Sequence, residues 1–171
     1  MSELFKLAIV YSQNGQFNEL KSILTHYPSL ITQLDSGNTT LLHKAIHSSK
    51  YEIASYLLKI GANINAQTKS GSTPLHLSVA INDPRMCYLL LQNTANINIP
   101  DSNGWTPLHI ASYMGYIEIV KLLLLYSPDL TLKDNSGKTP IEKAKNGDVE
   151  YLLLHHPKPQ RPFEIVRADI E

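Results

Sequence analysis

The segment Gly104-Trp-Thr-Pro-Leu-His109 decides the fold, because the chain repeats it at a fixed interval. Gly71-Ser-Thr-Pro-Leu-His76 lies 33 residues before it, and Gly137-Lys-Thr-Pro-Ile-Glu142 lies 33 residues after it. The histidine keeps the same interval in one further copy, at His43. A period of this length indicates a repeat architecture, in which each unit packs against its neighbours.

Each repeat contains the signals for two helices and a turn. The threonine hydroxyl can cap the amide three residues ahead, and proline suits the first position of a helix. A second helix is predicted after Gly115, over 116–125, because its apolar residues fall on one broad face. The segments Asp101-Ser-Asn-Gly104 and Asp134-Asn-Ser-Gly137 predict hairpin-like turns at the tip of an extended finger.

These features resemble the ankyrin-repeat family, whose pattern D-x-x-G-x-T-P-L-H-x-A is present at 101–111. The resemblance implies an all-α solenoid of stacked helix-turn-helix units with β-hairpin-like fingers. We expect an ankyrin domain over 1–156, followed by a proline-rich tail at 157–171. The expected parts of this domain are a cap (1–34), three repeats (35–67, 68–100 and 101–133) and a C-terminal cap repeat (134–156).

Some residues depart from the family pattern where glycine is expected. Gly61 stands at a helix end, where the backbone favours the left-handed conformation, but Thr94 and Ser127 replace it in the next two units. Asn82 replaces the glycine between two helices, and Gly37 comes one residue early in its finger. A residue other than glycine in a left-handed conformation costs on the order of 1 kcal/mol, so we expect the repeats at 68–100 and 101–133 to be locally soft.

Composition narrows the classes of function. Of the 171 residues, 43% are hydrophobic and 18% are charged, which is typical of a folded domain. Fifteen Lys and Arg residues balance fifteen Asp and Glu residues, and this balance disfavours a nucleic-acid binder or a polybasic membrane anchor. No apolar run approaches the roughly 20 residues that span a bilayer, and the N-terminal residues do not resemble a secretory signal. We expect a cytoplasmic protein, with the nucleus as the alternative.

Cysteine and histidine are the candidates for catalysis or metal binding. The resemblance implies that His43, His76 and His109 bridge backbone groups of neighbouring turns. Packed helices lie about 8–10 Å apart, so these histidines would be too distant to share one metal ion. Cys87, the only cysteine, has the same place in its helix as Val120 and is expected in the core. We predict no enzymatic activity, metal or cofactor; the alternative is an enzyme that uses Cys87 and a histidine.

The resemblance places partner contacts on the finger tips and on the exposed side of the first helices, which together form a concave strip. An apolar cluster of the kind enriched in binding hot spots is predicted there. Its members are Ile81, Trp105, Tyr113 and Met114. The other predicted contacts are His47, Lys69, Ser70, Ser72, Asn103 and Lys138. For Trp105 a second interpretation stays open, in which the ring shields the neighbouring turn.

The expected function is therefore to bind another protein, as a monomeric adaptor or inhibitor. Weak nucleic-acid binding through a rim of Lys69, Lys133 and Lys138 is the alternative. Asn65 and Asn98 also follow a Leu-x5-Ile-Asn frame, which is similar to the ankyrin motif that asparagine hydroxylases modify. The competing interpretation is that each of these asparagines bonds its own turn.

Overall fold

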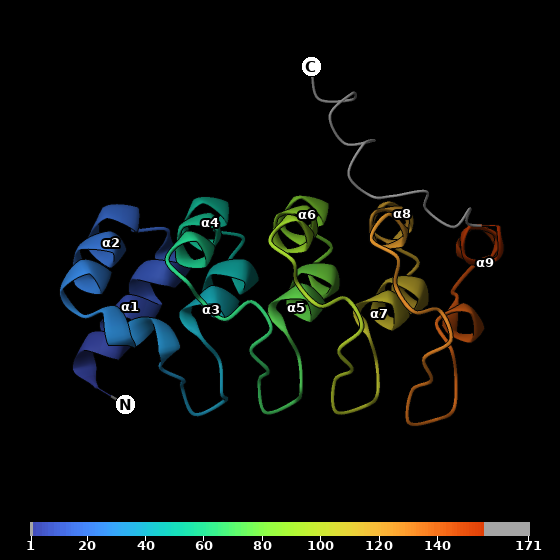
Figure 1. Ribbon diagram of the computed structural model, residues 1–171, viewed down its shortest axis with the longest axis horizontal. Helices are drawn as coiled ribbons and strands as arrows, with labels where there is room; N and C mark the ends of the chain where they lie inside the picture. The colour runs from blue at the N-terminus through green and yellow to red at the C-terminus, as the bar shows by residue number, and fades with distance from the viewer. Residues whose placement is uncertain (1, 156–171) are drawn as a thin grey trace, which may run out of the picture.

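The computed structural model describes residues 2–155, which form an elongated stack of helix pairs (Figure 1). These residues contain nine α-helices, two short 3-10 helices and no β-strand. The inner row of helices in Figure 1 consists of α1 (Glu3–Asn14), α3 (Leu41–His47), α5 (Pro74–Ala80) and α7 (Pro107–Met114). The outer row consists of α2 (Phe17–His26), α4 (Tyr51–Lys59), α6 (Pro84–Gln92), α8 (Ile117–Leu124) and α9 (Gly147–Leu154). The two 3-10 helices are η1 (Pro28–Thr32) and η2 (Ile141–Lys143).

The inner helices α3, α5 and α7 begin as the sequence predicts. In α7, the hydroxyl of Thr106 accepts a hydrogen bond from the amide of His109 (3.4 Å), and the His109 imidazole accepts one from the amide of Thr106 (3.1 Å). The same reciprocal pair begins α3 and α5. Because each pair satisfies two amides that the helix leaves unpaired, the short inner helices have fixed starting points.

Successive repeats share one apolar core. Helix α3 packs between α1 and α5, and α7 packs between α5 and the 3-10 helix η2. Leu42, Leu75 and Leu108, which keep the 33-residue interval, are almost completely buried between these helices. The small residues Ala45 and Ala111 are also fully buried, where a larger side chain would separate the packed helices. This stacking confirms the predicted all-α solenoid.

The fingers project beyond the inner row of helices (Figure 1) and are turns rather than strands. In the finger at 101–105, the amide of Asp101 donates to the carbonyl of Trp105 (2.8 Å). A backbone hydrogen bond connects this finger to the preceding one at 68–72: the amide of Ser102 donates to the carbonyl of Ser70 (2.9 Å). Gly71 is needed at this junction, because its φ is +75° and an added Cβ would lie 2.7 Å from the amide nitrogen of Ser102.

The helix ends confirm the expected left-handed residues. Gly61 has a φ of 94°, and its substitutes Thr94 and Ser127 have φ values of 64° and 53°. Asn82 also takes this conformation, with a φ of 54°. In the first finger, the left-handed residue is Asn38 rather than the displaced glycine before it. Asparagine tolerates this conformation better than most residues, so the finger keeps its shape.

The last described unit is reduced. Its inner helix is the single turn η2, and Glu142 replaces the histidine of the other units. The Glu142 carboxylate accepts hydrogen bonds from the amide (2.9 Å) and the hydroxyl (3.1 Å) of Thr139, and the Glu142 amide donates to the Thr139 hydroxyl (3.5 Å), so the reciprocal capping arrangement is preserved. The predicted end of the domain at 156 and the tail at 157–171 lie outside the described residues. Within the described part, no helix has the length and apolar character to cross a membrane.

Candidate functional site

The periodic histidines connect neighbouring repeats, as the resemblance implies. The imidazole Nε2 of His43 donates to the carbonyl of Ser72 (3.3 Å), that of His76 to Trp105 (2.9 Å), and that of His109 to Lys138 (3.1 Å). Burial lowers the pKa of all three, so each imidazole is neutral and both of its nitrogens have a structural partner. Residues 2–155 contain no group of three His, Cys, Asp or Glu side chains placed to hold a metal ion.

Cys87 packs in the core between two helices of one repeat. Its side chain is fully buried, and its sulfur lies 3.1 Å from the hydroxyl of Ser78. Burial raises the pKa of the Cys87 thiol to about 12. The thiol is therefore protonated at neutral pH and is not accessible as a nucleophile, which confirms the packing role predicted for it.

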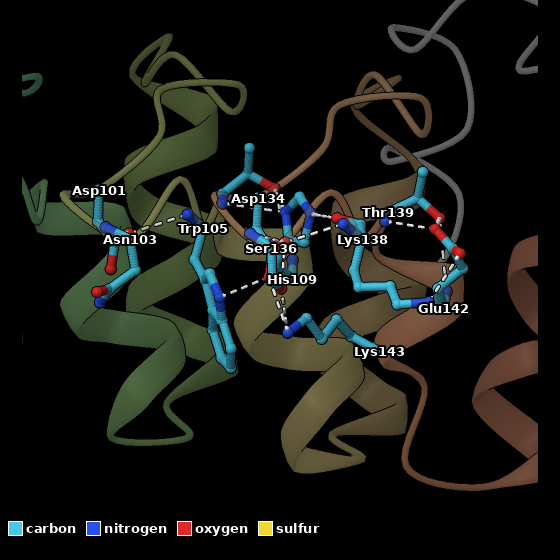
Figure 2. A network of polar contacts seen from close by, with 11 residues as sticks. Asp101, Asn103, Trp105, His109, Asp134, Ser136, Lys138, Thr139, Glu142 and Lys143 are labelled. Atoms are coloured by element: carbon cyan, nitrogen blue, oxygen red, sulfur yellow. Dashed lines mark hydrogen bonds and ion pairs between the residues drawn. The ribbon is translucent and has the colours of Figure 1, made fainter.

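Trp105 is fixed by the finger that follows it (Figure 2). Its indole N–H donates to the Asp134 carboxylate (3.0 Å), which also binds the ammonium of Lys143 (2.8 Å). The Asp134 side chain is 1% exposed and also accepts hydrogen bonds from the amides of Ser136 and Lys138. The Lys143 ammonium, together with these amides, holds the pKa of Asp134 well below its usual range. The indole is therefore anchored to a carboxylate that is ionised at neutral pH.

Tyr113 and Met114 extend this arrangement toward solvent. The rings of Trp105 and Tyr113 meet edge to face, with centroids 5.1 Å apart. Tyr113 is 53% exposed and Met114 is 38% exposed, whereas Trp105 is half-buried and Ile81 packs against the core. Trp105 thus covers the turn of Asp134 and supports an exposed tyrosine at the same time, so its two interpretations are compatible. We call Trp105, Tyr113 and Met114 the aromatic anchor.

Two hollows open beside the fingers. The remaining predicted partner contacts do not form one group, because they are divided between these hollows or lie outside them. The first, of about 430 Å³, brings together His47, Lys69, Ser70 and Ser72. The second, of about 470 Å³, lies next to the aromatic anchor, and Asn103 contributes to its wall (Figure 2). Lys138 lies outside both hollows, with its ammonium 3.4 Å from the Glu142 carboxylate.

The residues of the first hollow that sequence reasoning missed include Lys44 and Thr68. Lys44 is on α3, and its ammonium binds the Asp35 carboxylate at 2.6 Å. Thr68 carries a signal that could have been noticed. It stands where the other three fingers have an aspartate, at an interval of 33 residues from Asp35 and Asp101.

The two asparagines with a hydroxylation-like motif connect adjacent repeats. The side-chain oxygen of Asn65 accepts from the amide of Asn96 (2.9 Å), and that of Asn98 accepts from the amide of Asp129 (2.9 Å). The expectation that each bonds its own turn is therefore wrong. Asn63 and Asn96 do this instead, because their side chains reach the amides two residues ahead. Modification of Asn65 or Asn98 stays a prediction.

Comparison with known proteins agrees with this geometry. A family model of ankyrin repeats in three copies matches residues 60–134 and 79–162, and a second model of many ankyrin copies matches residues 7–78. The ankyrin repeat domain-containing protein OPG015 of Monkeypox virus is 40% identical over 53 residues. This stretch is 31% of the present chain and 12% of the viral protein, so the match spans a small part of that relative. The chain belongs to the ankyrin-repeat family, whose repeats are generally protein–protein interaction modules.

Proposed function

We propose that this protein binds a protein partner through the strip formed by its fingers and inner helices. The observation that carries the proposal is the aromatic anchor, in which the fixed, half-buried indole of Trp105 supports the exposed ring of Tyr113, next to the exposed Met114. Tyr113 and Met114 belong to the residue types that are enriched at protein interfaces. Large apolar groups that cluster on a surface are typical of an interaction site.

The fixed geometry lowers the cost of binding. Ordering a free side chain at an interface costs about 0.5–1.5 kcal/mol. The indole of Trp105 is already held by its 3.0 Å hydrogen bond to Asp134, and its ring supports Tyr113. A partner that packs against the indole therefore meets a ring that is already ordered before binding.

The proposed mode of action is to cover the surface of one partner protein or to connect two proteins. The described residues build stacked repeats, and the Cys87 thiol has no access to a substrate. We infer that this part of the chain acts by covering a partner's surface, as an inhibitor, or by holding two proteins together, as an adaptor. The partner is expected to insert apolar side chains against the aromatic anchor.

Affinity capture from native cell lysate tests this proposal. The test variant carries Tyr113→Ala and Met114→Ala, which leave the Trp105–Asp134 bond in place. A matched control carries Tyr27→Ala and Leu125→Ala, which remove exposed apolar groups (48% and 43% exposed) from other elements. We expect wild type and control to retain a protein that the test variant loses, with equal circular dichroism for all three. Equal retention by the two variants would contradict the proposal.

A further inference from the structure

One finger differs from the other three at its first residue. Three fingers begin with an aspartate whose carboxylate accepts hydrogen bonds from the amides two and four residues ahead; these are Asp35, Asp101 and Asp134. The finger at 68–72 begins with Thr68, whose hydroxyl accepts from the amide of Ser72 at 3.1 Å. The amide of Ser70, two residues ahead, donates to no side chain within residues 2–155. This finger thus lacks a carboxylate and keeps a free donor.

The hydroxyls of the same finger supply a second donor. The Thr68 and Ser70 hydroxyl oxygens are 2.9 Å apart, and those of Ser70 and Ser72 are 3.3 Å apart. These two hydrogen bonds use two of the three hydroxyl hydrogens of Thr68, Ser70 and Ser72. The third hydroxyl hydrogen remains free to donate to an acceptor on a ligand. The finger itself is fixed, because its backbone bonds the fingers on both sides: the Ser70 carbonyl accepts from Ser102, and the Lys69 amide donates to Gly37.

Lys69 supplies the first hollow with a positive charge. Lys69 is exposed and forms no ion pair with any of the described residues. Lys44 and the exposed His47 approach from α3, and the charge of Lys44 is matched by Asp35 behind it. None of the described residues that line the hollow is acidic. An anion that enters the hollow therefore meets an unmatched ammonium group and several hydrogen-bond donors.

We propose that this first hollow binds the phosphoryl group of a phosphorylated serine or threonine on the protein partner. The Ser70 amide, the free hydroxyl, the Lys69 ammonium and His47 offer more donors than the two oxygens of a carboxylate use, and they suit the three oxygens of a phosphoryl group. This inference rests on the proposed function, because the phosphorylated residue belongs to the partner that also contacts the aromatic anchor.

A titration of the free protein tests the inference without the partner. The ¹⁵N-labelled protein is titrated with N-acetyl-O-phosphoserine amide at constant ionic strength, and the amide shifts of residues 69–72 are followed by NMR. N-acetylserine amide and N-acetylglutamate amide are the matched probes. We expect saturable shifts with the phosphorylated probe and binding about tenfold weaker with the glutamate probe, because one charge-assisted hydrogen bond is lost. Equal binding of the two anionic probes would overturn the phosphoryl assignment.

Three variants locate the binding. Thr68→Asp gives the finger the aspartate of the other three, so the fold is expected to remain while the Ser70 amide is occupied and binding is lost. Lys69→Ala is expected to weaken binding about tenfold, and Lys133→Ala, which removes an exposed lysine from a different finger, leaves it unchanged. Binding by Thr68→Asp at the wild-type level, or equal weakening in the two lysine variants, would overturn the proposal. Partner capture through the aromatic anchor combined with no phosphoserine binding would overturn this inference alone.

Discussion

At the scale of single residues, backbone conformation at the helix ends controls local stability. Gly61 and Thr94 occupy corresponding positions after α4 and α6, and both have positive φ values of 94° and 64°. Glycine adopts this conformation without a steric penalty, whereas the Cβ of threonine crowds the backbone. The same fold therefore stores strain at the end of α6 and not at the end of α4.

We predict that Thr94→Gly raises the melting temperature and stabilises the protein by about 1 kcal/mol. The reciprocal change, Gly61→Ala, is expected to destabilise the protein by a similar amount. An added Cβ at Gly61 would meet no atom within 4 Å, so the loss of stability would come from the backbone conformation alone. Thermal unfolding followed by circular dichroism measures both changes. A fall in the melting temperature of Thr94→Gly would mean that helix α6 ends in a different way.

At the scale of elements, helix starts and ends can be predicted from local sequence signals, whereas contacts between repeats cannot. Threonine before proline and a glycine at a helix end act within a few residues, so the starts of α5 and α7 and the helix end at Gly61 can be predicted from the sequence. The bond from Trp105 to Asp134 joins adjacent fingers through two residues 29 positions apart, and no single repeat contains it. The first hollow likewise forms where α3 meets the finger at 68–72, which is why Lys44 escaped the sequence analysis.

The capped inner helices make stability depend on pH. Burial lowers the pKa of His43, His76 and His109 in the folded protein, whereas in the unfolded chain they bind protons below about pH 6.5. Their contribution is complete above that pH and is lost as the pH falls, by up to about 1.4 kcal/mol per histidine and pH unit.

We therefore expect the urea midpoint of unfolding to be lower at pH 5.5 than at pH 7.5. His76→Gln provides a matched variant, because glutamine can form the capping box and does not titrate. Its midpoint should change less between the two pH values than that of wild type. Identical midpoints of the wild type at both pH values would show that these histidines are not buried in the neutral form.

At the scale of the whole molecule, the stack is uneven along its length. Each repeat of a solenoid is stabilised by its neighbours. The unit of η2 and α9 has a single-turn inner helix, and the buried residues of α9 are Val149 and Leu153. The middle repeats, in contrast, have longer inner helices that each pack against an inner element on both sides.

Hydrogen exchange measured by mass spectrometry should show this difference directly. We predict that the amides of α9 exchange faster than those of α5 and α7, because local opening of the last described unit exposes little apolar surface. Uniform protection from α5 to α9 would contradict this prediction and would indicate that the stack opens as one cooperative unit.

The central claim is that the aromatic anchor contacts a protein partner, and site-specific photo-crosslinking in native cells tests it most directly. A photoreactive phenylalanine analogue would replace Tyr113 in one variant and Tyr151 in another; Tyr151 is 62% exposed but lies on α9. The account predicts a discrete crosslinked protein from position 113 and none from position 151. Crosslinking from position 151 alone, or from neither position, would contradict it.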